Sequence, residues 1–272
     1  MDDEGRRLFL AHESYTDHTV TALDPATWLE IAAIPLPLSP YSLAWDADSH
    51  RLLVSHPDQN AISLTNVEAG RVEAIAATAV ELVDLEVDQA RGHVYISDRA
   101  GRLRVFDSDS DAELATLPAQ GAVSVDSPHG RLYTGGGDLG APVRVFDAER
   151  LEQIGTIAML GAQPVAAPHS GGLYLVRDGV YIASLGTKRV TGVISDTLPR
   201  PGHSNPSPAA VGALVAPGTG RLFVVMNTGS TSTSNGNCLS VHEPISHEKE
   251  VSGSAEISVD FPDVDCAGSG LA

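Results

Sequence analysis

The chain has 272 residues, 42% of them hydrophobic and 19% charged, a composition typical of a folded globular protein rather than a disordered one. Its 35 acidic residues outnumber 17 Lys and Arg, and the resulting net charge of −18 repels phosphate backbones and anionic lipids, which argues against nucleic acid as a partner. No run approaches the roughly 18 consecutive apolar residues of a membrane span, and the start MDDEGRRLFL is acidic where a signal peptide is basic, so we expect neither membrane insertion nor a leader in the chain as given.

One apolar phrase recurs six times along the chain. The phrases are RLFLAH (7–12), RLLVSH (51–56), HVYISD (93–98), RLYTGG (131–136), GLYLVR (172–177) and RLFVVM (221–226), with starts 44, 42, 38, 41 and 49 residues apart. Each is followed by a polar turn and a second alternating strand, as in AISLTN (61–66), and then by a third. A further strand precedes each phrase from the second onward, as in VDLEVDQARG (83–92). A period of about 40–45 residues with four short strands per unit is typical of propeller blades.

The two ends of the repeat complement each other. The first unit lacks the strand that precedes its phrase, whereas AEISVDFPD (255–263) supplies a spare one. Because an incomplete blade exposes sheet edges, we predict an all-β, six-bladed β-propeller of four-stranded antiparallel blades, closed by the C-terminal strand pairing into blade 1. The single domain covers 1–272, with blade 1 at 7–38 plus 255–263, blade 2 at 39–78, blade 3 at 79–118, blade 4 at 119–160, blade 5 at 161–199 and blade 6 at 208–254.

The repeat resembles the YVTN-type β-propeller family, whose units read roughly R-x-Y-V-T-N, a polar turn, V-S-V-I-D, a strand, and V-A-V-S-P-D-G. HVYISDRAGRLRVFD and RLLVSHPDQNAISLTN are the most similar stretches, and the resemblance covers residues 7–263. It implies the fold and leaves the activity open, since members include lactonase-like, binding and surface proteins. The family's Asn is replaced at each repeat by His12, His56, Asp98, Gly136, Arg177 and Met226.

One face of a propeller, here called the top face, carries the loops between the phrase strand and the next strand and the loops that enter each innermost strand. Such loops often bind ligands. Candidate binding residues on it are His12, Glu13, His56, Asp58, Asp98, Arg99, Asp138, Arg177, Asp178 and Asn227. Acidic and basic residues both occur in this set, which fits a polar or zwitterionic ligand. His12, His56 and Asp98 share one repeat position and suit a transition metal, but neighbouring sheets lie about 10 Å apart, which favours a turn-capping role.

Two insertions interrupt the repeat, SDTLPRPGHSNPSPAAVG (195–212) and NTGSTSTSNGN (227–237). Both would emerge on the top face. Long loops on a rigid scaffold often carry function, and the alternative is a tolerated insertion. If they form a binding site, Arg200, His203, Asn205 and Asn227 are the nearest candidates.

Acidic residues mark the innermost strands. Asp84, Glu86 and Asp88 cluster in blade 3, and the closing strand adds Glu256 and Asp260. Oxygen ligands suit calcium, and the resemblance to calcium-dependent lactonases implies an ion that polarises an ester carbonyl and activates water. A candidate metal set is therefore Asp84, Glu86 and Glu256. Against it, no innermost strand contains Asn, and the turn residues Asp46, Asp88, Asp126 and Asp260 are explained by Asx capping.

Familiar catalytic motifs are missing from the sequence. It contains no G-x-S-x-G nucleophile elbow and no phosphate loop. GGGDLG (135–140) lies inside a hairpin with no helix after it, so we interpret it as a flexible turn. Cys238 should lie near the top face and Cys266 near the opposite one, farther apart than the roughly 7 Å that a disulfide spans, so we expect free thiols.

The leading hypothesis is a non-catalytic binding or scaffold module without a cofactor, which engages a small polar ligand or a protein partner on its top face. One alternative is a calcium-dependent, lactonase-like hydrolase with carboxylates in the central channel. The other is an assembly subunit that uses the outer edge of a blade.

Overall fold

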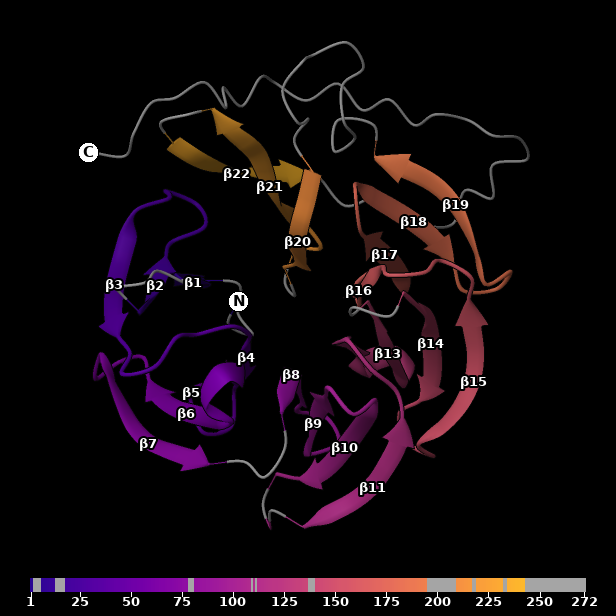
Figure 1. Ribbon diagram of the computed structural model, residues 1–272, viewed down its shortest axis with the longest axis horizontal. Coiled ribbons are helices and arrows are strands. Elements are labelled where there is room, and N and C mark those ends of the chain that lie inside the picture. The colour runs from indigo at the N-terminus through magenta and orange to yellow at the C-terminus, as the bar shows by residue number, and fades with distance from the viewer. Residues whose placement is uncertain are drawn as a thin grey trace.

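The computed structural model is a ring of antiparallel sheets around a central axis (Figure 1). It describes residues 1, 6–12, 18–77, 81–108, 110, 112–136, 140–194, 209–216, 219–231 and 234–242, with backbone alone at 77, 209–211 and 226–242. β4, β8, β16 and β20 lie nearest the axis in this view, and β3, β7, β11, β15 and β19 lie at the perimeter. The strand that precedes each phrase is thus the innermost of its sheet.

The strands form consecutive sheets in chain order. The first is β1 (Leu8–His12), β2 (Thr19–Leu23) and β3 (Glu30–Pro35); the second is β4 (Leu43–Asp46), β5 (Arg51–His56), β6 (Ala61–Asn66) and β7 (Arg71–Ala77); the third is β8 (Leu82–Asp88), β9 (His93–Asp98), β10 (Arg102–Asp107) and β11 (Glu113–Pro118). The fourth is β12 (Ala122–Asp126), β13 (Arg131–Gly136), β14 (Ala141–Asp147) and β15 (Glu152–Ile157); the fifth is β16 (Gln163–Ala167), β17 (Gly172–Val176), β18 (Val180–Ser184) and β19 (Arg189–Ile194); the sixth is β20 (Ala209–Val215), β21 (Leu222–Thr231) and β22 (Ser234–His242).

The prediction of an all-β propeller with four-stranded antiparallel blades is confirmed. The structure counts as a five-bladed propeller, whereas the sequence predicts six blades. In the described part of the chain only the sheets from β4 to β19 have four strands, so the count depends on the three-stranded sheets at the two ends. The closing strand at 255–263 lies outside the described residues, and closure by it stays a prediction.

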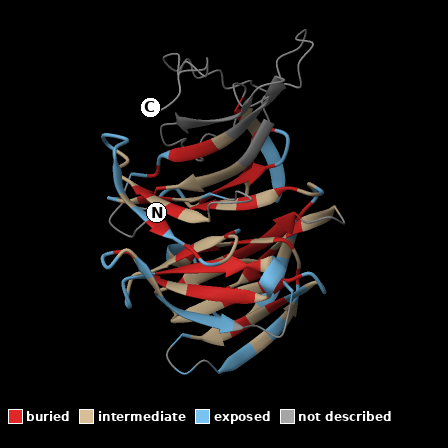
Figure 2. Cartoon of the chain, turned by 60° about the vertical axis from the view of Figure 1, so that its left-hand side comes forward, coloured by how far each residue is buried: buried red, intermediate tan, exposed pale blue. Residues whose placement is uncertain are grey.

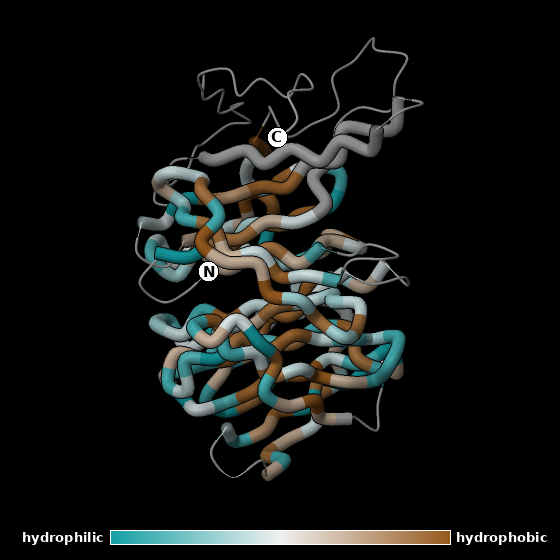
Figure 3. Tube along the Cα trace, turned by 90° about the vertical axis from the view of Figure 1, so that its left-hand side faces the viewer, coloured by the Kyte–Doolittle hydropathy of each residue, from teal (hydrophilic) through white to brown (hydrophobic). Residues whose placement is uncertain are grey.

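The hydrophobic core consists of clusters between neighbouring sheets. Alternating residues on each strand face the next sheet, as Val20 of β2 does against Leu52 and Val54 of β5. A further cluster joins the first and sixth sheets, because Leu8 of β1 packs with Ala216, which follows β20, and with Phe223 of β21. Burying one such large apolar side chain contributes about 1.5–3 kcal/mol. Figures 2 and 3 show the pattern: buried, hydrophobic stretches run through the sheets, and exposed, hydrophilic residues gather at turns and outer strands.

The outermost strands share one irregularity. A β-bulge interrupts the pairing of β2–β3, β6–β7, β10–β11, β14–β15 and β18–β19 at the equivalent place. Bulges bend an edge strand and discourage pairing with a second chain. Within the described residues, no helix is long and apolar enough to cross a membrane.

Candidate functional site

A cavity of about 880 Å³ lies at one end of the central axis. Its walls come from the entry to β4, the starts of β8, β12 and β16, the middle of β20, and the β5–β6 and β9–β10 loops. These are the two kinds of loop that the sequence assigns to the top face. Small-molecule sites commonly have volumes of about 300–1,000 Å³, so the cavity is large enough for a metabolite.

Equivalent residues of four sheets form a ring in this wall. Ser42, Asp84, Ala122 and Gln163 each lie four residues before the last residue of the innermost strand of their sheet. Because the repeat places equivalent residues at the same height, these side chains surround the axis at one level. The ring explains why residues about 40 positions apart in the chain line one cavity.

Asp84 ties three innermost strands together. Its carboxylate accepts hydrogen bonds from the Ser42 hydroxyl, from the Leu85 amide at 2.9 Å and from the Val123 amide at 2.8 Å. Burial raises the pKa of Asp84, and these three donors act in the opposite direction by favouring its charged form. The residue predicted as a metal ligand therefore already has protein donors on both carboxylate oxygens.

The wall beside Asp84 is held by backbone and hydroxyl contacts. The buried Ser97 hydroxyl donates to the Gly121 carbonyl at 2.6 Å and accepts from the Asp84 amide at 3.1 Å. Gly121 has φ +86°, and a Cβ there would lie 2.1 Å from the Gly135 carbonyl oxygen. The entry to β12 and the end of β13 approach so closely that only glycine fits at position 121.

Several polar side chains of the wall remain available to a ligand. Asp58 and Arg99 are both exposed, and neither forms an ion pair with another described residue. Gln120 and Gln163 complete this set, and Tyr41, which is 58% exposed, also lines the cavity. The sequence pattern identified the hairpin-loop residues Asp58 and Arg99 but missed Tyr41, Gln120 and Gln163. The segments that lead into the innermost strands also lie on the top face. Including these segments among the candidate loops would have identified the three residues.

The three predicted residues that share the repeat position occupy different surroundings. His12 is exposed at the end of β1. His56 is fully buried: its Nδ1 donates to the Ser39 carbonyl at 2.8 Å, and its Nε2 accepts from the Ser63 hydroxyl at 2.7 Å. Burial lowers the pKa of His56. His56 therefore positions a cavity residue, Ser39, from behind the wall.

Asp98 lines the cavity but is 1% exposed, because it accepts hydrogen bonds from the Arg102 amide at 3.0 Å and from Arg102 Nε at 2.9 Å. Arg177 is exposed on the β17–β18 turn and is not part of the cavity wall. Asn227 belongs to β21, with its side chain outside the description. The candidates that lie outside the described residues are Glu13, Asp138, Arg200, His203, Asn205, Glu256 and Asp260.

Metal ligation by the predicted sets stays a prediction. In the described part of the chain, no three His, Cys, Asp or Glu side chains form a group that could hold a metal ion. In the set Asp84, Glu86 and Glu256, the last residue lies outside that part of the chain. The prediction of free thiols also stays untested, because Cys238 lies in β22 but Cys266 is not described.

Glu86 provides a pH-dependent prediction. Burial and the negative charge of Asp84 raise the pKa of Glu86 from its ordinary value of 4.5 to about 8. The folded protein thus keeps a proton that the unfolded chain releases, and stability falls as pH rises from about 4.5 to about 8. Glu86→Gln removes this loss. A pKa moved from 4.5 to about 8 corresponds to roughly 5 kcal/mol, and solvent screening reduces this because Glu86 is only partly buried. We therefore expect the variant to be more stable than the parent by about 2 kcal/mol at pH 8.5 and equally stable at pH 4.5.

Urea unfolding at the two pH values measures the difference. Glu152→Gln is the matched control, because it removes the same charge from an exposed position on β15 and should change little at either pH. An equal effect of Glu86→Gln at both pH values would contradict the raised pKa.

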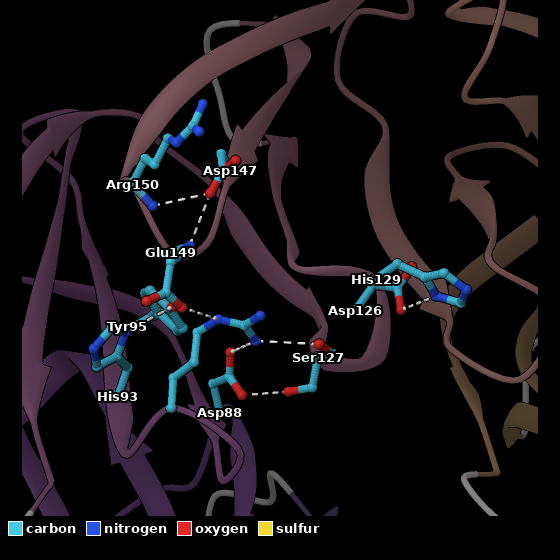
Figure 4. Close-up of polar contacts among 10 residues, drawn as sticks. Asp88, His93, Tyr95, Asp126, Ser127, His129, Asp147, Glu149 and Arg150 are labelled. Carbon is cyan, nitrogen blue, oxygen red and sulfur yellow. Dashed lines mark hydrogen bonds and ion pairs between the residues drawn. The ribbon is translucent and has the colours of Figure 1, made fainter.

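A second polar cluster lies at the opposite ends of the innermost strands (Figure 4). The fully buried Asp88 accepts from the Ser127 hydroxyl and from Arg91 Nη1, and Arg91 also donates to the Ser127 carbonyl at 3.1 Å. His129 Nδ1 donates to Asp126 at 2.7 Å.

Asx capping was predicted for the turn aspartates. Asp46 does bond its own turn, because its carboxylate accepts from the amide of Asp48 at 3.2 Å. The capping interpretation is wrong for Asp88, which joins the third sheet to the fourth.

The sheets and the axial cavity define the class of the protein as a β-propeller. Known structures agree at the level of fold: the chain is similar to Kuenenia stuttgartiensis hydrazine synthase, with 12% identity, a TM-score of 0.56, and coverage of 83% of this chain and 75% of the other. It is also similar to U3-55K, with 11% identity, a TM-score of 0.60 and coverage of 83% and 72%. No family model and no curated protein matches the sequence, so the YVTN repeat type stays a prediction.

Proposed function

We propose that the protein is a binding module that holds a small polar ligand in the axial cavity. The observation that carries the proposal is the exposed pair Asp58 and Arg99, of opposite charge, in the wall of a cavity of about 880 Å³. Pockets that bind small molecules combine a preformed hollow with a few polar groups that fix the ligand. The ring of innermost strands, tied by Asp84, supplies the preformed hollow.

Binding rather than hydrolysis is favoured by how the carboxylates of the wall are used. Asp84 and Asp98 accept hydrogen bonds from protein donors, which leaves Asp58 as the exposed acidic group among the described lining residues. A ligand can therefore be held between Asp58 and Arg99 without displacing a structural contact.

Thermal melts with a library of amino acids, sugars, organic acids and nucleosides test this proposal. A ligand that binds only the folded state raises the melting temperature with concentration. We expect Arg99→Ala to weaken the affinity for the ligand at least tenfold, since a hydrogen bond to a charged group is worth about 1.5–3 kcal/mol.

Arg177→Ala is the matched control, because Arg177 is an exposed arginine on the equivalent loop of the fifth sheet but outside the cavity wall. It should leave the affinity within about twofold. If no compound in the library stabilises the parent protein, or if both variants weaken binding equally, the proposed site is wrong.

A further inference from the structure

The charged groups of the cavity wall are not balanced. Among the described lining residues, the acidic side chains are Asp58, Asp84 and Asp98, and the basic side chain is Arg99. Asp98 forms an ion pair with Arg102, whose Nε donates to Asp98 Oδ2 at 2.9 Å, so its charge is compensated from outside the wall. The described wall therefore presents two carboxylates and one guanidinium to a ligand, and its excess charge is negative.

The charge of Asp84 is stabilised but not cancelled by the groups that bond it. All three donors are uncharged, namely the Ser42 hydroxyl and the amides of Leu85 and Val123. Such donors favour the ionised carboxylate and leave its negative charge in place. Ser42 and Leu85 both bond Oδ1, whereas Val123 alone bonds Oδ2. Because a carboxylate oxygen has two acceptor sites, Oδ2 of Asp84 keeps one site for a donor on a ligand.

Asp58 and Arg99 belong to the hairpin loops of neighbouring sheets. Asp58 lies in the short turn Pro57–Gln59 between β5 and β6, and Arg99 directly follows β9. The Arg99 amide donates to the Glu81 carbonyl at 2.9 Å, which ties this loop to the segment that enters β8. Both side chains are exposed, and neither forms an ion pair with another described residue. A ligand that pairs with Asp58, Asp84 and Arg99 together needs two cationic groups and one anionic group.

We propose, building on the proposed binding function, that the cavity binds a free basic amino acid, whose carboxylate pairs with Arg99 and whose two cationic groups pair with Asp58 and Asp84. Lysine and arginine each carry a carboxylate, an α-ammonium group and a side-chain cation, so their charges match those of the wall one to one. The net charge of −18 also attracts a ligand with a net positive charge. A neutral amino acid would leave one carboxylate without a partner, and an acidic one would place a second carboxylate beside it.

Titration calorimetry with lysine and arginine tests the class of ligand, because analogues exist that each remove one charged group. Norleucine lacks the side-chain ammonium of lysine, Nα-acetyllysine lacks the charge of the α-amino group, and cadaverine lacks the carboxylate. Citrulline, Nα-acetylarginine and agmatine form the corresponding set for arginine. We expect a basic amino acid to bind and each deletion to weaken the affinity at least about tenfold, as the loss of a hydrogen bond between charged groups does. Glutamate and glucose should not compete.

Variants of the protein assign each contact. Arg99→Ala, Asp58→Asn and Asp84→Asn should each weaken binding of the basic amino acid at least about tenfold. In Arg99→Ala the analogue without a carboxylate should bind as well as the complete amino acid, because that carboxylate has lost its partner. Asp48→Asn is the matched control, since it removes the same charge from an exposed turn between β4 and β5, outside the cavity wall, and should keep the affinity within about twofold. If Asp84→Asn does not fold, Asp58→Asn decides.

The outcomes separate this inference from the proposed function. If only neutral or acidic compounds bind, and Arg99→Ala weakens them, the basic amino acid is overturned as the ligand and the binding site stands. If lysine or arginine binds, but Asp58→Asn retains the affinity of the parent protein, the charge pairing is wrong. If no amino acid, analogue or other library compound binds, both proposals fail.

Discussion

Asp84→Ala is expected to lower the free energy of unfolding by about 3 kcal/mol. The substitution removes an acceptor from the Ser42 hydroxyl and from the amides of Leu85 and Val123, which belong to three neighbouring sheets. A part-buried donor that loses its acceptor costs about 1–3 kcal/mol, and water from the cavity can replace some of these bonds. Chemical denaturation at pH 7 measures the loss, and hydrogen exchange at the Val123 amide should accelerate in the same variant.

Asp58→Ala is the control for Asp84→Ala. It removes a carboxylate from the same cavity, but from an exposed position on the β5–β6 loop, and should change stability by less than about 0.5 kcal/mol. Asp84→Asn keeps one side-chain carbonyl acceptor and should fall between the two. If Asp84→Ala matches Asp58→Ala, the carboxylate does not hold the sheets together.

The sheets were predictable because their signals are local. The phrases at 51–56, 93–98 and 131–136 coincide with β5, β9 and β13. Period-two alternation and turn residues act within one hairpin, so a single sequence contains the information. The blade count depends on how the chain ends pair, which is a contact between distant residues, and there the sequence-based count of six differs from the five recognised.

The cavity was predictable only in part, because its contacts join residues far apart in the chain. Asp84 reaches Ser42 and Val123, 42 and 39 residues away. His56 shows the same limit: the sequence indicates a histidine beside a polar turn, whereas Ser39 and Ser63 satisfy both of its ring nitrogens in the interior. Asp98 and Arg177 are equivalent in the repeat, yet only Asp98 lines the cavity.

The glycine-rich stretch that begins at Gly135 has the composition of a flexible turn. Gly135 itself, however, is needed for close packing between sheets. A Cβ on Gly135 would lie 2.6 Å from the Ala162 carbonyl oxygen, so this glycine permits close approach between the fourth and fifth sheets. Composition alone does not separate a glycine needed for flexibility from one needed for proximity. The distinction depends on the neighbouring sheet, which the local sequence does not contain.

Gly121→Ala adds one methyl group to the cavity wall and is expected to lower the free energy of unfolding by about 4 kcal/mol. Two costs add. Alanine at φ +86° is strained by about 1–2 kcal/mol, and its Cβ would lie 2.1 Å from the Gly135 oxygen and 2.7 Å from the Gly135 carbon. Both contacts are with backbone, so no rotamer change relieves them and the entry to β12 must shift. Chemical denaturation measures the loss of stability.

Gly161→Ala separates the two costs. Gly161 has φ +71°, and nothing lies within 4 Å of the position that an added methyl group would take, so the substitution carries the conformational strain alone, about 1 kcal/mol. The difference of about 3 kcal/mol between the two variants is then the cost of pushing the entry to β12 away from the end of β13. Because Gly121 lines the cavity, the same shift should abolish ligand binding in any Gly121→Ala protein that still folds, whereas Gly161→Ala should bind normally. Equal stability of the two variants would mean that the close approach at Gly121 does not shape the cavity.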